Sequence, residues 1–216
     1  MSDSTEANPE APENLGAMVY QDLRMKLVVG DFRPGEAVSI RKLAAEYGTS
    51  AMPVREALKR LSDEKALVGA AKKAYRVPDL SAREAGDLFF VRSVLEAAGA
   101  EVAATCMSAQ AIDELAALDR TMEDATSRLD ARDLLKNNFR FHTLIAQGSG
   151  NPVLSEMVKS IYVRTGPWLA HGIMHLAQSE DWKSDHAEIV AALEYRDSAK
   201  AKALIEKKAP KKKANH

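Results

Sequence analysis

Residues 39–61 of this chain read SIRKLAAEYGTSAMPVREALKRL, and this stretch decides the fold of the N-terminal part. Ser39 and Ser50 each carry a hydroxyl that can cap a helix, and apolar residues follow each of them at helical spacing. Gly48 separates the two expected helices where the backbone must turn sharply, which glycine tolerates. Two short helices joined across such a turn predict a helix-turn-helix.

The second of these helices has one apolar face and one basic face. Its predicted buried stripe consists of Val54, Ala57, Leu58 and Leu61. In a helix-turn-helix the second helix enters the major groove of DNA, and its first turns reach the base edges. The sequence therefore predicts DNA contacts from Ser50, Arg55, Lys59 and Arg60.

A small basic hairpin is expected directly after the helix pair. Residues 67–70 and 75–77 have the composition of short strands, and the polar turn between them contains Lys72 and Lys73. Such a hairpin is a wing, and we expect its lysines to contact the DNA backbone. Upstream, residues 15–29 have apolar side chains at helical spacing, which predicts a helix packed behind the motif.

The charge distribution agrees with a DNA partner. Residues 15–80 contain twelve Lys and Arg residues against eight Asp and Glu residues, although the whole chain has a formal net charge of -1. This basic surplus attracts a phosphate backbone. Residues 1–14, with four acids and two prolines, predict a disordered acidic tail, and the lysine-rich residues 209–216 predict a solvated basic tail.

Residues 81–208 show long helical periods without strand-like alternation. Helices are expected at 82–104, 112–129, 133–146, 153–168, 182–194 and 198–208. The first of them carries an apolar stripe formed by Leu88, Val91, Leu95, Ala98 and Val102. Short Gly, Pro and polar breaks between helices favour an antiparallel bundle. The predicted fold class is mainly α: a winged helix-turn-helix with a small β-hairpin, followed by an antiparallel helical bundle.

The hydropathy of the chain and its single cysteine limit the classes of protein to which it can belong. No stretch reaches the roughly 20 apolar residues of a membrane span, and the polar, acidic start is unlike a secretion signal. We therefore expect a cytoplasmic protein without a membrane partner. Cys106 is the one cysteine and has no activating cation beside it in the sequence, so we interpret it as a small helix residue.

Several segments together resemble one known family. Residues 30–35 (GDFRPG) and 47–61, with the block PVREAL at 53–58 as the most specific part, resemble the winged helix of GntR-family bacterial transcription regulators. Residues 87–96 (DLFFVRSVLE) and the GNPVL run at 150–154 resemble the helical effector domain of the FadR subfamily. The resemblance spans about residues 15–208. It implies a ligand-responsive DNA-binding regulator and adds Arg41 of the first motif helix as a base or phosphate contact.

The chain departs from the family pattern in its DNA-reading part. Ala51 stands where these regulators usually have an arginine, and Lys72, Lys73 and Ala74 stand where a wing-tip glycine is common. An arginine that forks onto guanine contributes about 1 to 3 kcal/mol of discrimination. We therefore expect an operator that differs from the common family consensus or is read more weakly.

Candidate ligand-binding residues lie in the expected bundle. Asn138 and His142 are four residues apart and share a helix face, and His186 can meet them across the bundle, as a divalent metal site such as a zinc site requires. In many members of the resembled subfamily the matching residues are Asp, His, His and His. Here Asn138 replaces the carboxylate and Lys208 falls where the last His is expected, so we predict a weak or absent metal. The two histidines are then bundle residues, ligand contacts without a metal, or a surviving metal site.

The resemblance also implies a small anionic effector, such as an organic acid. The residues that would hold it are Arg92, Asn138, His142, His186 and Lys208. The spacing of Arg92 with the neighbouring leucines turns it inward, and a buried guanidinium needs an anionic partner. Glu96, four residues further on, is the alternative partner, and Lys208 lies close enough to the chain end to remain in solvent.

We interpret the chain as a homodimeric, ligand-responsive regulator, expected to be a repressor, whose partner is double-stranded operator DNA. A homodimer is expected because one winged helix contacts too few base pairs to find a site in a genome. One alternative is an architectural DNA protein without an effector. The other is a bundle enzyme using His142 and Lys208 as acid and base, but no catalytic motif supports it and a reaction centre leaves the basic winged helix unexplained.

Overall fold

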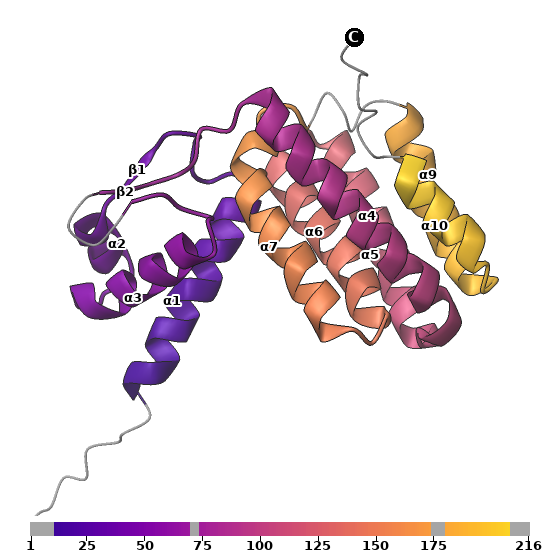
Figure 1. The fold of residues 1–216 in the computed structure, drawn as a ribbon, viewed down its shortest axis with the longest axis horizontal. Coiled ribbons are helices and arrows are strands. Elements are labelled where there is room, and N and C mark those ends of the chain that lie inside the picture. The colour runs from indigo at the N-terminus through magenta and orange to yellow at the C-terminus, as the bar shows by residue number, and fades with distance from the viewer. Residues whose placement is uncertain (1–10, 70–73, 174–179, 208–216) are drawn as a thin grey trace, which may run out of the picture.

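The computed structural model describes residues 11–69, 74–173 and 180–207. Residues 11–77 form a winged-helix domain and residues 82–207 a helical domain beside it (Figure 1). The winged-helix domain contains α1 (Ala11–Val28), β1 (Ala37–Val38), α2 (Ile40–Glu46), α3 (Ala51–Asp63) and β2 (Tyr75–Arg76). The helical domain contains α4 (Ala82–Cys106), α5 (Ala109–Ser127), α6 (Ala131–Gly148), α7 (Pro152–Leu169), α9 (Glu180–Glu194) and α10 (Ser198–Lys207).

The predicted caps place most of these helices. The Ser39 hydroxyl accepts a hydrogen bond from the Lys42 amide and begins α2, and Gly48 follows that helix with a positive φ of 60°. Ser81 and Glu84 form a reciprocal capping box at the start of α4. One boundary differs from the prediction: α1 begins at Ala11, so residues 11–14 are helical and not part of a disordered tail. Residues 1–10 and 208–216, including the predicted basic tail, lie outside the described residues.

The wing is smaller than predicted and has an additional strand. Val68 and Arg76 exchange two backbone hydrogen bonds of 2.8 Å, which confirms the antiparallel pairing of the two arms. The sheet itself pairs β2 with β1, with Val38 opposite Tyr75. Sequence alternation did not reveal β1, because two residues are too short to show a period of two. Lys72 and Lys73 of the predicted wing turn lie outside the described residues.

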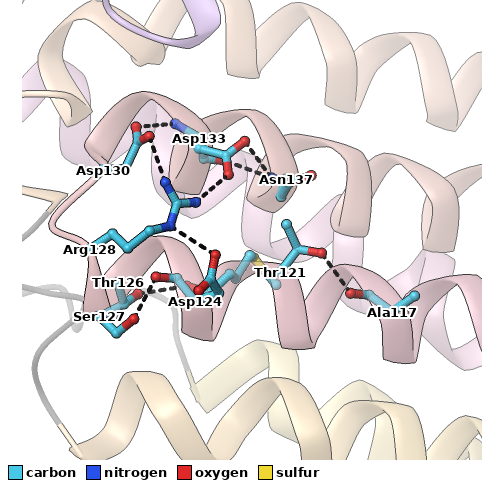
Figure 2. Close-up of polar contacts among 10 residues, drawn as sticks. Ala117, Thr121, Asp124, Thr126, Ser127, Arg128, Asp130, Asp133 and Asn137 are labelled. Atoms are coloured by element: carbon cyan, nitrogen blue, oxygen red, sulfur yellow. Dashed lines mark hydrogen bonds and ion pairs between the residues drawn. The ribbon is translucent and has the colours of Figure 1, made fainter.

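The turn between α5 and α6 is held by Arg128. Its guanidinium contacts the carboxylates of Asp124 at 2.8 Å, Asp133 at 3.1 Å and Asp130 at 3.3 Å (Figure 2). Asp130 also caps α6 by accepting a hydrogen bond from the Asp133 amide. These groups are largely exposed, so each pair contributes little alone, but together they fix the turn that makes α5 and α6 antiparallel neighbours.

Helix α4 contacts much of the helical domain, packing against α10, α6 and α7. The face it buries consists mainly of small residues, namely Ala85, Ser93, Ala97, Gly99, Ala100, Ala103 and Ala104. The apolar stripe seen in the sequence lies only partly toward the core: Leu88 and Leu95 are half-buried, while Val91, Ala98 and Val102 are exposed. Small side chains allow close helix approach, which explains why the larger residues were misleading as markers of the core.

The two domains share an apolar core. The side chains of α7 residues Val158, Tyr162 and Val163 join the cluster formed by α1 and α3. Across the same boundary, the Arg132 guanidinium makes two hydrogen bonds of 3.1 Å to the carboxylate of Asp31. The winged-helix domain is therefore held against the bundle by α1–α7 packing (Figure 1).

Gly166 permits a close approach between the backbones of α7 and α1. A Cβ atom at this position would lie 2.3 Å from the carbonyl oxygen of Leu27 and 2.7 Å from the Cα of Val28. Because both neighbours are backbone atoms, α1 must move if residue 166 has a side chain. We expect Gly166→Ala to lower the free energy of unfolding by about 1 to 3 kcal/mol, the usual range for overpacking.

Thermal unfolding monitored by circular dichroism measures this effect, at about 2 to 4 °C per kcal/mol for a chain of this size. Gly86→Ala in α4 is the matched control, since its added Cβ meets nothing within 4 Å. That control should keep or raise the melting temperature, because alanine is the better helix former. An unchanged melting temperature in Gly166→Ala would contradict the tight α1–α7 contact.

None of the helices in the described part of the chain is long and apolar enough to span a lipid bilayer.

Candidate functional site

The exposed face of α3 has the residues of a nucleic-acid interface. Ser50 begins this helix, and its side chain makes no capping hydrogen bond, so its hydroxyl remains available. Arg55 is exposed and makes no ion pair with the described residues. Lys59 is exposed as well and pairs with Asp63 at 2.8 Å, a surface pair that is easily exchanged for another anion. Arg41 of α2 is also exposed.

The structure places Arg60 differently from the other predicted DNA contacts. Its guanidinium lies 3.8 Å from the ring centroid of Tyr20 in α1 and pairs with Glu64 at 3.4 Å. It also lines a cavity between α3 and the helical domain. Arg60 therefore faces the bundle, so we leave it out of the DNA-contacting set.

Sequence reasoning missed one residue of this face. Met52 lies three residues before Arg55, and 64% of its surface is exposed. An exposed apolar side chain at the start of a recognition helix is available to a thymine methyl group. In the sequence, Met52 was recognisable only as an apolar residue that lies outside the buried stripe of α3. That stripe consists of Val54, Ala57, Leu58 and Leu61.

A second candidate site is a buried polar cluster inside the helical domain. It comprises Arg92 and Glu96 of α4, Asn138 and His142 of α6, Tyr162 of α7 and His186 of α9. The rings of His142 and His186 meet edge to face, with centroids 5.6 Å apart, which confirms that the two imidazoles come together across the bundle. Glu96, only 5% exposed, has its Oε1 atom 3.6 Å from Arg92 Nε and 3.7 Å from His142 Nδ1.

Arg92 faces inward, as the sequence predicts. Its guanidinium lies over the Tyr162 ring at 4.3 Å and over the Phe89 ring at 4.8 Å. The ion pair with Glu96 that the sequence allowed is present. Even so, the Nε and Nη1 atoms of Arg92 are buried without a hydrogen bond to the described residues, as is Oδ1 of Asn138.

Tyr162 connects this cluster with the winged-helix domain. Burial raises the pKa of its hydroxyl well above the ordinary value, although the Arg92 charge opposes that shift, so the group stays neutral. The same side chain belongs to the apolar cluster that contains α1 and α3, and its ring meets Phe139 at 5.4 Å. Tyr162 therefore contacts both the polar cluster and the apolar core of the winged-helix domain.

The donors in the cluster do not fit a divalent metal ion. In the part of the chain that the structure describes, no group of three or more His, Cys, Asp or Glu side chains is placed to hold one. Asn138 supplies only a neutral amide oxygen, and the Arg92 guanidinium repels a cation. Lys208, the remaining predicted residue, lies outside the described residues.

Comparison with known families assigns both parts of the chain. Residues 15–77 match the family described as bacterial regulatory proteins, gntR family, and residues 87–207 match the FCD domain. These spans correspond to the winged-helix domain and the helical domain.

Curated relatives and solved structures agree. The HTH-type transcriptional regulator McbR of Escherichia coli (strain K12) is 30% identical over 186 residues, covering 85% of this chain and 84% of that protein. The HTH-type transcriptional repressor GlaR of the same organism is 28% identical, covering 86% and 88%. The structure of E. coli McbR/YncC superposes with a TM-score of 0.82 at 28% identity, covering 89% and 92% of the two chains.

A structure from Rhodococcus sp. RHA1, described as a putative transcriptional regulator GntR, supports the fold alone, with a TM-score of 0.74 at 19% identity. The gntR family, McbR and GlaR are regulators of transcription, so the chain acts by binding DNA and not as an enzyme. The basic recognition helix, the buried polar cluster and both family matches show that this chain belongs to the GntR family of bacterial transcription regulators that carry an FCD domain.

Proposed function

We propose that the chain is a cytoplasmic homodimeric repressor that binds a near-palindromic operator and releases it when a small organic anion enters the helical domain. The observation that carries the proposal is the pairing of an exposed basic recognition helix with a buried polar cluster, joined through Tyr162. Burying charged groups costs stability. An architectural DNA protein binds no effector and so has no use for such a cluster.

The proposed DNA contacts come from three elements. Ser50, which precedes α3, and Met52 and Arg55 of α3 read base edges, while Lys59 of α3 and Arg41 of α2 hold phosphates. Lys72 and Lys73 of the wing add phosphate contacts that do not depend on sequence.

The proposed dimer interface is the exposed apolar stripe of α4. Val91, Val94 and Val102 expose 43%, 52% and 48% of their surfaces, and Phe90 and Ala98 lie on the same side of the helix. Contiguous exposed apolar residues on a stable helix mark an interaction site. We propose that a second copy of the chain covers this stripe, because two winged helices are needed to contact two half-sites of DNA. A twofold axis brings the same stripe of both copies together.

The proposed effector is an organic acid bound without a metal by Arg92, Asn138, His142 and His186, with Lys208 as a further candidate. The buried nitrogen atoms of Arg92 that make no hydrogen bond to the described residues support a ligand that brings acceptor oxygens. Because Glu96 already offsets the Arg92 charge, the favoured ligand has one carboxylate and additional hydroxyl or carbonyl groups and not a high negative charge.

Calorimetry with a panel of hydroxy and keto acids tests this site. We expect Arg92→Ala and His142→Ala each to weaken binding about tenfold or more, the loss that follows removal of a charge-assisted hydrogen bond. Far-UV circular dichroism verifies that both variants fold, and Arg120→Ala on the outer face of α5 is the control.

Unchanged acid binding in both folded variants would place the effector elsewhere. Metal analysis of protein purified without a chelator or a His-tag provides the second measurement. We expect less than stoichiometric zinc, and a tightly held stoichiometric ion would contradict the metal-free interpretation.

A further inference from the structure

A cavity lies between the two domains, outside the buried polar cluster. Its volume is about 430 Å³, which falls in the range of small-molecule sites. Residues of both domains line it: Arg24 and Met25 of α1, Arg60 of α3, Phe139 of α6, and Glu156 and Lys159 of α7. The proposed functions of the recognition helix and the effector cluster leave this cavity without a role.

The charged side chains of the cavity give it a positive character. Three cations meet two carboxylates: Lys159 pairs with Glu156 at 2.7 Å, and Arg60 pairs with Glu64 at 3.4 Å. Arg24 makes no ion pair with the described residues, and its guanidinium lies 5.4 Å from the centroid of Tyr20. A guanidinium that keeps its donors at the wall of a cavity is suited to a bidentate carboxylate or phosphate.

The state of Glu156 agrees with that charge balance. Its hydrogen bond with Lys159 lowers the pKa of its carboxyl, and the charges of Arg24 and Arg60 lower it further. Glu156 is therefore a resident anion in a positive field. It is 62% exposed at its side chain, so it can swing toward solvent when another anion takes its place.

The remaining lining residues are the polar Gln21 and three apolar residues. Met25, Val28 and Phe139 present sulfur, methyl and ring surfaces beside the cations. The Phe139 ring also contacts Tyr162, which separates this cavity from Arg92 and Glu96. A matching ligand has a small apolar body and one anionic head.

We propose that this interdomain cavity binds a small organic anion, whose carboxylate or phosphate group pairs with Arg24 and Lys159. Its apolar part packs on Met25 and Phe139. Because α1 and α7 supply the two cations, an occupied cavity favours the arrangement of the domains observed here. This site shares no residue with the proposed effector cluster or with the proposed operator contacts.

The test uses the full chain labelled with ¹³C at the methionine methyl groups. Phenyl phosphate and benzoate are the two organic probes, inorganic phosphate tests the head group alone, and benzamide is the uncharged comparison. We expect the Met25 methyl signal to shift saturably with phenyl phosphate or benzoate, and not with benzamide. The Met18 signal, from an exposed residue of the same helix, should stay in place.

Variants locate the charge requirement. Arg24→Gln and Lys159→Gln should each weaken the Met25 response about tenfold or more, while Arg120→Gln should leave it unchanged. Arg92→Ala should also leave it unchanged, which separates this site from the effector cluster.

Phenyl phosphate binding stronger than benzoate binding would identify a phosphate head, and the reverse a carboxylate head. The proposal would be overturned if no anionic probe shifts the Met25 signal saturably. It would also be overturned if Arg24→Gln and Lys159→Gln both give the same Met25 shift as the unsubstituted chain.

Discussion

Arg55→Ala is expected to abolish specific operator binding while the fold stays intact. Arg55 is exposed one turn into α3 and makes no ion pair with the described residues, so its removal leaves no buried partner unsatisfied. A bidentate arginine–base contact contributes about 1 to 3 kcal/mol of discrimination. Two copies at two half-sites then lose about 2 to 6 kcal/mol, or about 30-fold to 20,000-fold in affinity. Titration of a labelled operator fragment by fluorescence anisotropy measures this loss.

Two sets of variants make that result specific. Arg120→Ala removes an exposed cation from α5 and should keep operator affinity, while Arg60→Ala should lose far less than Arg55→Ala because Arg60 lies over Tyr20. Lys72→Ala and Lys73→Ala should weaken operator and unrelated DNA alike and reduce the salt dependence. Full operator affinity in Arg55→Ala would contradict the assignment of α3 as the recognition helix.

Val94→Glu is expected to convert the proposed dimer into a monomer. Val94 lies in the middle of the exposed α4 stripe, so a twofold interface would bring two new carboxylates into an apolar contact. Burying unpaired charges costs several kcal/mol, and we expect the dissociation constant of the dimer to rise about a thousandfold or more. Sedimentation velocity at micromolar concentration measures the change, and operator affinity should fall with it.

Tyr195→Glu provides the control for this substitution. Tyr195 exposes 84% of its surface and lies outside α4. Its replacement should leave the sedimentation coefficient of the dimer unchanged. A dimeric Val94→Glu protein, or a wild-type chain that is monomeric both free and on DNA, would contradict the proposed interface.

Local signals in the sequence were sufficient for most of the fold. Caps at Ser39 and Ser81, the glycine turn at Gly48 and the apolar period of α3 all act over a few residues, so they predicted helix positions closely. The missed features depend on contacts between distant segments. Strand β1 exists only because Tyr75 pairs with Val38, and α1 extends to Ala11 without an apolar signal there.

The candidate sites show the same division. Helical spacing predicted that Arg92 and Glu96 are neighbours and that Asn138 and His142 share a helix face, and the structure places His142 beside both Glu96 and His186. Spacing did not reveal which face of α4 is packed, because alanine and glycine carry no strong periodic signal there. It also gave no indication that the Arg60 guanidinium lies over the ring of Tyr20, forty residues earlier in the chain.

Selection of bound fragments from the source genome, followed by footprinting, tests the central claim most directly. A dimeric regulator that reads bases through α3 should enrich one near-palindromic site. Its two half-sites should be protected on the same face of the duplex, about one helical turn or a multiple of it apart. Binding to that site should be about a thousandfold or more tighter than to random fragments. Uniform enrichment of all fragments, with an affinity set by salt alone, would contradict the account.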